Sequence, residues 1–238
     1  LDHTFGGKIT SCLVNPRACH ETEMPVTPTA TRKRIAVVGA GPAGLACSVT
    51  AAERGHDVVL FDAASEIGGQ FNIAKQVPGK EEFHETLRYF RRQLDVQGVT
   101  LHLDTRVEAD RLLQGGFDEI VLATGVTPRV PAIPGIDHPK ALGYLDVLRD
   151  GTEVGENVAV VGAGGIGFDV TEYLMHRGRS ASVAPEKFYA EWGIDTSYAQ
   201  AGGIREPEIE AAPRRVHLLQ RKAAEVGDGL GKTTGGIH

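Results

Sequence analysis

The hydrophobic pattern of the chain becomes regular at residue 34. Two short runs rich in β-branched residues, at 34–38 and 57–61, are typical of parallel strands buried on both faces. Between them, an alanine-rich stretch to Arg54 indicates a helix, and Gly55 suits the left-handed turn after a helix. The chain from 34 to 61 therefore predicts one βαβ unit of about thirty residues.

The same kind of pattern continues through the rest of the chain. Phe83, Leu87, Phe90 and Leu94 recur at helical spacing, so we expect a helix over 80–97 with these side chains on one face. Strands are expected at 99–103 and 119–123. A second strand–glycine–helix pattern occupies 157–177, but its next strand appears only at 216–220. The polar, proline-interrupted stretch 180–214 is therefore interpreted as an insertion.

These elements predict an α/β fold with two Rossmann-like dinucleotide-binding units. The predicted organisation is a linker segment at 1–33, the first part of one α/β domain at 34–150, and an incomplete second domain at 151–238 that carries the 180–214 insertion. The two glycine turns are too far apart for a solenoid repeat, and their separation suits two nucleotide-binding halves.

Each predicted unit carries glycines at the three positions that a dinucleotide pyrophosphate requires. The first glycine permits a tight turn, the second lets the phosphate approach backbone N–H groups, and the third lets the helix pack on the strand. The first turn has Gly39, Gly41 and Gly44, with Ala43 beside them, and the second has Gly162, Gly164 and Gly167. A single such turn often only connects a strand to a helix, but two turns, each between a strand and a helix, favour dinucleotide binding.

The residue after the second strand of each unit indicates which nucleotide it binds. Asp62 lies 23 residues beyond Gly39, close to the ~20 expected for a carboxylate that bonds ribose hydroxyls, so the first unit suits FAD or NAD. The alternative is that Asp62 only caps a turn. The second unit has Arg221 and Lys222 there, and cations suit the 2′-phosphate of NADPH. The alternative for these two residues is a pair of solvated cations.

Composition restricts the function further. Of 238 residues, 41% are hydrophobic and 24% are charged, as in an ordinary globular protein, although 30 glycines are many. The net charge of −6 without a basic stripe argues against nucleic-acid binding, and no apolar run is long enough to cross a membrane. Three cysteines without a Cys-x-x-Cys pair exclude a redox dithiol and suit a reducing compartment, so we expect a cytoplasmic protein.

The segment between the two glycine turns resembles the two-dinucleotide flavoprotein reductases. In that family an Ala-Thr-Gly turn ends a strand beside the FAD, as Ala123, Thr124 and Gly125 do in this sequence. The run Ile67-Gly68-Gly69-Gln70 is similar to the second turn that contacts the FAD. The resemblance therefore implies that Thr124, Gly125, Gly69 and Gln70 are cofactor-binding residues.

Longer segments resemble the bacterial NADPH-dependent 2,4-dienoyl-CoA reductases of the old-yellow-enzyme-like flavoproteins. The similar segments are 7–21, 68–83, 135–140, 144–150 and 219–234. The resemblance implies a three-part enzyme with an FMN barrel that binds the acyl-CoA, a [4Fe-4S] cluster and an FAD/NADPH part. It implies that 1–33 is a segment flanking the cluster and a linker, that 34–150 is the first part of the FAD-binding domain, and that 151–238 is the incomplete NADPH-binding domain. Electrons would pass from NADPH through FAD and the cluster to FMN, in the β-oxidation of unsaturated fatty acids.

The same resemblance implies that Cys12 is the fourth cluster ligand. A cluster needs several convergent thiolates, so Cys12 alone cannot hold one. Cys47 is expected to pack in a core, and no catalytic acid or base is predicted. The chain is interpreted as a truncated portion of the enzyme, which we expect to bind dinucleotide weakly or not at all and to lack reductase activity by itself.

Two other functions remain open. One is a structural nucleotide-binding module, as in trimethylamine-dehydrogenase-like proteins, where the equivalent region holds ADP. The other is a general NAD(P)H electron-relay reductase that resembles the small subunit of glutamate synthase. The cations Arg221 and Lys222 favour NADPH over the ADP module.

Overall fold

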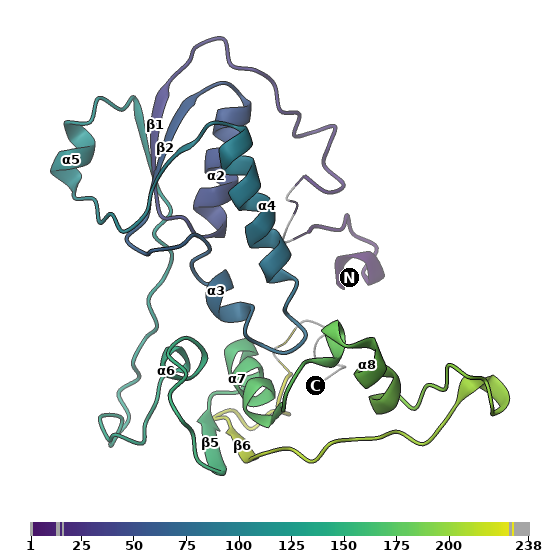
Figure 1. Cartoon of the computed structure of the whole chain (residues 1–238). Coiled ribbons are helices and arrows are strands. Elements are labelled where there is room, and N and C mark those ends of the chain that lie inside the picture. Colours follow the sequence, from purple (N-terminus) through teal and green to yellow (C-terminus); the bar gives the residue numbers. More distant parts are fainter. Residues whose placement is uncertain (1, 13–14, 16, 229, 231–238) are drawn as a thin grey trace. The chain divides into compact units, whose positions relative to one another are not determined.

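The computed structural model describes residues 2–12, 15, 17–228 and 230. The chain divides into two compact units, each with helices packed on parallel strands (Figure 1). The first unit takes in residues 3–72 and 83–133, and the second takes in 73–82 and the described residues from 134 onward. The predicted α/β fold class is confirmed.

The first unit is a four-stranded parallel sheet with the strand order β3-β2-β1-β4. Its register pairs Val38 with both Phe61 and Leu122, so the carboxyl ends of β1, β2 and β4 meet at one edge. Its elements are β1 (Arg34–Val38), α2 (Pro42–Glu53), β2 (Asp57–Phe61), α4 (Phe83–Val96), β3 (Thr100–His102), α5 (Ala109–Leu113) and β4 (Glu119–Leu122). The four-residue helix α1 (Asp2–Phe5) accompanies them, and the four-residue helix α3 (Phe71–Ala74) begins in this unit and ends in the second.

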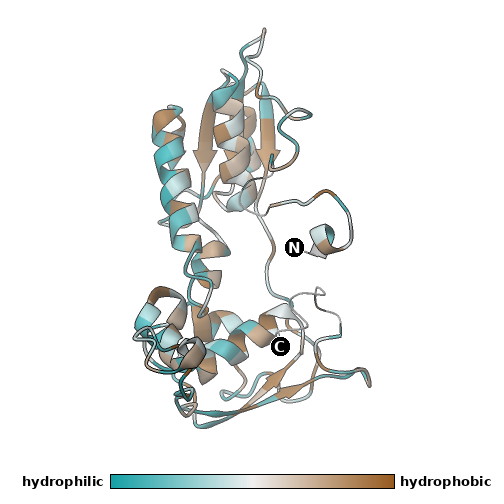
Figure 2. Ribbon diagram, turned by 90° about the vertical axis from the view of Figure 1, so that its right-hand side faces the viewer, coloured by the Kyte–Doolittle hydropathy of each residue, from teal (hydrophilic) through white to brown (hydrophobic). Residues whose placement is uncertain are grey.

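The core of this unit lies where α2 and α4 pack on the sheet. Val37 and Leu60 of the strands and Leu45 of α2 are inaccessible to solvent, and Leu94 of α4 is 2% exposed. After a charged first residue, β1 and β2 are hydrophobic (Figure 2), as the β-branched runs predicted. Helix α4 begins at Phe83, three residues later than predicted, because residues 77–80 form a turn.

The second unit has a two-stranded parallel sheet. Its elements are α6 (Tyr144–Leu148), β5 (Asn157–Val161), α7 (Gly165–Met175), η1 (Ala181–Val183), α8 (Pro185–Glu191), η2 (Ala201–Gly203) and β6 (Arg215–Leu219). The register pairs Asn157 with Arg215 and Val161 with Leu219. The strand predicted at 216–220 is therefore present, displaced by one residue.

The two sheets differ in how much of their surface is covered. The three middle residues of β1 are buried, whereas exposed and half-buried residues alternate along β5 and β6. Val158 and Val160 face α7, and Val161 is 71% exposed. The strand β5 is therefore less buried than β1, because only one face of β5 has a covering layer within the described chain.

The pairing of strand ends shows how many residues connect the two paired strands in each unit. Val38 pairs with a residue 23 positions later, and Val161 pairs with a residue 58 positions later, so the second crossover is 35 residues longer. The extra length contains η1, α8, η2 and a small antiparallel bridge between Ile194 and Ile204. Pro185 stands in the first turn of α8, where its missing N–H leaves no hydrogen bond unmade.

Two segments pack with the second unit although they precede its glycine turn in sequence. Val77 from 73–82 and Val147 and Leu148 from α6 are buried with Val170 and Leu174 of α7. The compact units thus place 73–82 and 134–150 with the second unit, whereas the sequence ranges place them in 34–150. The physical reason is that these apolar side chains fill the surface of α7.

No helix in the described part of the chain is both long enough and apolar enough to cross a bilayer.

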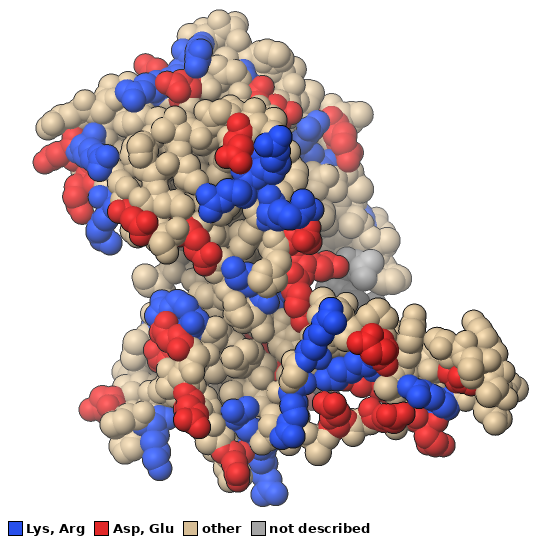
Figure 3. Space-filling model, viewed as in Figure 1, with Lys and Arg blue, Asp and Glu red and all other residues tan. Residues whose placement is uncertain are grey.

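Acidic and basic side chains are interspersed on the face shown in Figure 3. The exposed arginines of α4, Arg88, Arg91 and Arg92, contribute basic side chains to the surface, and Arg88 pairs with Glu85 at 2.6 Å.

Candidate functional site

The first glycine turn joins the end of β1 to the start of α2. Gly39 has a φ of +107°, and its N–H donates a 2.7 Å hydrogen bond to the carbonyl of Phe61. A Cβ on Gly39 would lie 2.3 Å from the carbonyl oxygen of Ala123, and one on Gly44 would lie 1.8 Å from that of Gly39. Only glycine fits at these two positions, as predicted from the sequence.

Gly41 occupies the middle of the turn and has open space in front of it. It precedes the first helical residue Pro42, and a Cβ built on Gly41 would meet no atom within 4 Å. Ala43 is exposed in the first turn of α2. The backbone therefore presents a helix N-terminus that no side chain covers, and this geometry fits a phosphate group.

Two further turns lie against this one, as the predicted cofactor residues require. Gly68 donates a 2.8 Å hydrogen bond to the carbonyl of Ala40, and a Cβ on Gly69 would lie 3.1 Å from the Cα of Gly41. Gly69 and Gln70 are therefore brought to the glycine turn, and both are exposed.

The turn after β4 approaches from the other side. The N–H of Ala123 donates a 2.8 Å hydrogen bond to the carbonyl of Val38. The Cα of Thr124 lies 3.2 Å from the Cβ position of Gly39, and Gly125 follows with a φ of +72°. The structure thus brings together all the residues predicted for the first cofactor site, which come from four separate parts of the sequence.

Asp62 directly follows β2 and serves the turn structurally. Its carboxylate accepts one hydrogen bond from the N–H of Ala40 and a second, of 2.8 Å, from the N–H of Ala64. Both interpretations of Asp62 are compatible with this geometry, because an ionised carboxylate has about four lone-pair sites and two remain for ribose hydroxyls.

The second glycine turn repeats the first position by position. Gly162 has a φ of +120°, and its N–H donates a 2.8 Å hydrogen bond to the carbonyl of Leu219. A Cβ on Gly167 would lie 1.8 Å from the carbonyl oxygen of Gly162, the distance found for Gly44 and Gly39. Gly164 precedes α7 and has open space in front of it, as Gly41 does.

The hydrogen bonds also identify the residue that corresponds to Asp62. Because Leu219 corresponds to Phe61, the next residue, Gln220, stands in the position of Asp62. Arg221 and Lys222 follow it and are exposed. Sequence reasoning missed Gln220 because it ended the strand one residue too late. Aligning the last residue of each strand with its glycine turn is the signal that finds it.

The sequence did not indicate a cluster of four polar residues beside α7. Lys80 and Asp169 form a 2.5 Å ion pair, and Ser182 donates a 2.6 Å hydrogen bond to Glu81. Burial raises the pKa of Glu81, but the hydrogen bonds from Ser182 and Ser180 outweigh it, so the pKa lies below its ordinary value of 4.5. These contacts attach residues 80 and 81 to α7 and η1.

The three cysteines are not brought together. Cys12 and Cys19 are exposed, and the Sγ of Cys12 accepts a 3.4 Å hydrogen bond from the N–H of Asn15. Cys47 packs against the core of the first unit, as predicted, and burial raises the pKa of its thiol. Among the described residues no cluster of His, Cys, Asp and Glu could hold a metal ion.

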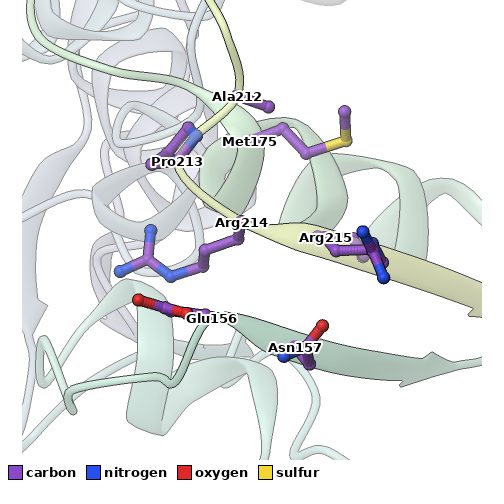
Figure 4. A pocket seen from close by; sticks show the side chains of 8 residues that line it. Glu156, Asn157, Met175, Ala212, Pro213, Arg214 and Arg215 are labelled. Atoms are coloured by element: carbon purple, nitrogen blue, oxygen red, sulfur yellow. The ribbon is translucent and has the colours of Figure 1, made fainter.

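A hollow opens at the opposite end of the second sheet from the glycine turn. Figure 4 shows Glu156 and Asn157 at the start of β5 and Arg214 and Arg215 at the start of β6 on its rim. Arg214 donates a 3.1 Å hydrogen bond to the carbonyl of Leu174. In open α/β sheets, ligands bind at the carboxyl ends of the strands, so we assign no ligand to this hollow.

Comparison with known proteins covers most of the chain. Residues 33–222 match the family model described as pyridine nucleotide-disulphide oxidoreductase. The chain is 35% identical over 182 residues to the metal reductase of Desulforamulus reducens, which covers 75% of this chain and 27% of that protein. It is 32% identical over 176 residues to the bilirubin reductase of Mediterraneibacter gnavus, which covers 74% of this chain and 28% of that protein.

A solved structure shows the same arrangement. The chain resembles a 2-naphthoyl-CoA reductase in complex with 2-naphthoyl-CoA, with a TM-score of 0.68 and 35% identity over 73% of this chain and 26% of that one. The chain thus spans little more than a quarter of the length of each of these relatives.

Proposed function

Because the chain belongs to the pyridine nucleotide-disulphide oxidoreductase family, whose domain implies FAD and NAD(P)H, we propose that its first glycine turn binds FAD and its second binds NADPH. The observation that carries this proposal is the duplicated turn. Gly39 and Gly162 make the same hydrogen bond to the neighbouring strand, and each precedes a helix N-terminus with open space in front of it.

The residues of this chain hold and orient the two nucleotides. Gly41 and Gly164 leave the helix N-termini accessible to phosphate, Asp62 suits an unphosphorylated ribose, and Arg221 and Lys222 suit a phosphorylated one. When bound, such a pair supplies two-electron transfer from nicotinamide to flavin and one-electron transfer onward from the flavin. No described side chain needs to act as an acid or a base in this scheme.

We further propose that the whole protein is an NADPH-dependent 2,4-dienoyl-CoA reductase of unsaturated fatty acid β-oxidation. The sequence resemblance supports this substrate, and so does the CoA thioester bound to the similar 2-naphthoyl-CoA reductase. A cinnamate reductase of Clostridium sporogenes, 31% identical over 174 residues, also has an unsaturated carboxylic compound in its name. FMN, the acyl-CoA and the remaining cluster ligands would be held outside this chain, with Cys12 as one ligand.

The test uses the full-length protein. Its flavin, iron and sulfide content is measured, and its visible spectrum is followed during anaerobic titration with NADPH and then with a 2,4-dienoyl-CoA. We expect FAD and FMN, bleaching of the flavin band by NADPH, and recovery of the band with the dienoyl-CoA. Bleaching without recovery would contradict the substrate and leave a general electron-relay reductase. A protein that retains ADP and shows no bleaching would be a structural nucleotide module instead.

A further inference from the structure

A cavity lies on the first unit's sheet, on the face that α5 covers. Alternate residues of β2 point to opposite faces, and Val58 and Leu60 pack with α2 and α4. Val59 and Phe61 therefore point to the other face, where Leu112 of α5 packs with them (Figure 1). These last three side chains are buried and form the floor of a cavity of about 310 Å³, which we call the α5 cavity.

Two arginines stand at the edge of the α5 cavity, but only one of them is engaged by other polar groups. Arg34 donates a 2.5 Å hydrogen bond to the carbonyl of Gly115 and pairs with Asp57 at 3.6 Å. The guanidinium carbon of Arg111 lies 5.7 Å from the centroid of the Phe61 ring. Among the residues that the structure describes, Arg111 has no ion-pair partner and no side-chain hydrogen bond. Arg111 is therefore the cation that can pair with a bound anion.

Flat side chains line the cavity beside this cation. The imidazole of His102 stacks on the ring of Phe61, with the ring centroids 5.2 Å apart and the planes 15° apart. Phe117 meets Phe61 edge-on, with the centroids 6.2 Å apart. His102 and Thr100 are exposed, and in the described part of the chain neither side chain forms a hydrogen bond. The cavity thus combines aromatic surfaces with an imidazole and a hydroxyl that can bond a polar ligand.

The size and the charge of the α5 cavity select one class of ligand. Its volume lies at the lower end of the roughly 300–1,000 Å³ found for small-molecule sites, so it suits one or two rings and is too small for a dinucleotide. Because Arg34 pairs with Asp57, Arg111 supplies the unbalanced charge, and an anion is favoured. A guanidinium binds a carboxylate through two parallel hydrogen bonds.

The α5 cavity also reaches the edge of the sheet at which ligands bind. Phe61 is the last residue of β2 and directly precedes Asp62. The carbonyl of His102 accepts a 2.9 Å hydrogen bond from the N–H of Asp62. In open α/β sheets, ligands bind at the carboxyl ends of the strands. The hollow at the start of β5 and β6 lacks this property.

We propose that the α5 cavity binds a small aromatic carboxylate, at a site separate from the two glycine turns. The carboxylate of the ligand pairs with the guanidinium of Arg111. Its ring packs on the apolar floor of Val59 and Leu112, beside the imidazole of His102. This ligand is a third small molecule in addition to the two dinucleotides of the proposed function, and its binding does not depend on either of them.

The experiment uses the full-length protein with its flavin bound. The probe is benzoate, with benzamide as the neutral control and cyclohexanecarboxylate as the non-aromatic control. Hydrogen–deuterium exchange of the peptides that cover 100–117 is measured at increasing probe concentration, which gives a Kd for this cavity even if the protein binds the probe elsewhere. We expect benzoate to protect these peptides with a Kd below about 1 mM, and both controls to bind at least about tenfold more weakly.

Three variants show which arginine holds the carboxylate. Arg111→Met keeps an apolar side chain over Phe61 and should weaken benzoate binding by at least about tenfold. Arg111→Lys keeps the charge but loses the paired hydrogen bonds, so its affinity should lie between those of Arg111→Met and the wild type. The matched control is Arg106→Met, which removes an exposed arginine that pairs with Glu108 at 3.6 Å outside the cavity. This control should bind benzoate as the wild type does.

Retained FAD content shows that each variant is folded. Wild-type affinity for benzoate in Arg111→Met overturns the proposal, as does equal binding of benzoate and either control compound. Protection by benzoate that appears only in peptides outside 100–117 overturns it as well. None of these results bears on dinucleotide binding, which the bleaching of the flavin by NADPH tests separately.

Discussion

The backbone N–H of Gly162 donates a 2.8 Å hydrogen bond to the carbonyl oxygen of Leu219, two residues that are 57 positions apart. Gly39 makes the same bond to Phe61 across only 22 positions. The glycine turn and the end of the second strand are therefore fixed to each other in both units. This bond determines which residue stands beside the glycine turn, whatever the length of the crossover.

The third glycine of each turn is required for the fold. We expect Gly44→Ala to destabilise the protein by at least about 2 kcal/mol, because its Cβ would lie 1.8 Å from the carbonyl oxygen of Gly39. Chemical denaturation measures this change. Gly41→Ala is the matched control, with no atom within 4 Å of its Cβ.

The same control tests the ligand site. The free energy of unfolding of Gly41→Ala should lie within about 0.5 kcal/mol of the wild-type value, because the backbone conformation of Gly41 suits alanine. Its FAD affinity should nevertheless fall by more than about tenfold, because the methyl group stands where the phosphate approaches. Wild-type FAD affinity in Gly41→Ala would argue against the first turn as the flavin site.

Asp62 contributes to stability as well as to binding. We expect Asp62→Ala to cost about 1–3 kcal/mol of unfolding free energy, because the N–H groups of Ala40 and Ala64 lose their acceptor. Asp62→Asn keeps one carbonyl oxygen and should lose less. Urea denaturation of the three proteins tests the order, and an Asp62→Ala variant as stable as the wild type would show that water replaces the carboxylate.

Glu81 gives the protein a small dependence of stability on pH. Its pKa in the folded state lies below 4.5, so ionised Glu81 contributes stability above that pH, and the contribution is lost as pH falls through the folded value. Between pH 6 and pH 3, Glu81→Gln should lose less stability than the wild type, by under about 1 kcal/mol, since the carboxylate is largely exposed to solvent screening. Ser182→Ala should show the same reduced slope. Parallel curves for all three would contradict this assignment.

The cysteines differ in reactivity according to burial. Cys47 packs against the core of the first unit, and this burial raises the pKa of its thiol. A smaller fraction of Cys47 is therefore thiolate at pH 8. With iodoacetamide we expect the exposed Cys12 and Cys19 to be alkylated at least about tenfold faster than Cys47, as measured by peptide mass spectrometry. Equal alkylation rates for the three cysteines would show that α2 opens locally. In the control variant Cys47→Ala, the slowly alkylated peptide should be absent.

Local patterns in the sequence were sufficient for the strands and for the glycine turns. The runs at 34–38 and 57–61 form the strands predicted there, because a buried parallel strand must be largely apolar and β-branched. The run at 157–161 also forms a strand, although it is only partly buried. The glycines at 44 and 167 were predictable for the same kind of reason, since the contact that excludes a Cβ is built into the turn itself.

Other features depended on contacts between distant residues. The start of α4 at Phe83 follows from Val77, which is buried against α7 and takes residues 77–80 out of the helix. Helix α8 was not predicted, because Pro185 was interpreted as a break, although proline in the first turn of a helix is favourable.

The sequence by itself determined that this protein has two parallel-stranded units with glycine turns suited to dinucleotides, because strand burial and tight turns constrain residue types locally. Only the tertiary structure decided that Gln220 corresponds to Asp62. The sequence could not measure a crossover 35 residues longer than the first, whereas strand pairing and the bond between Gly162 and Leu219 fix the register through space.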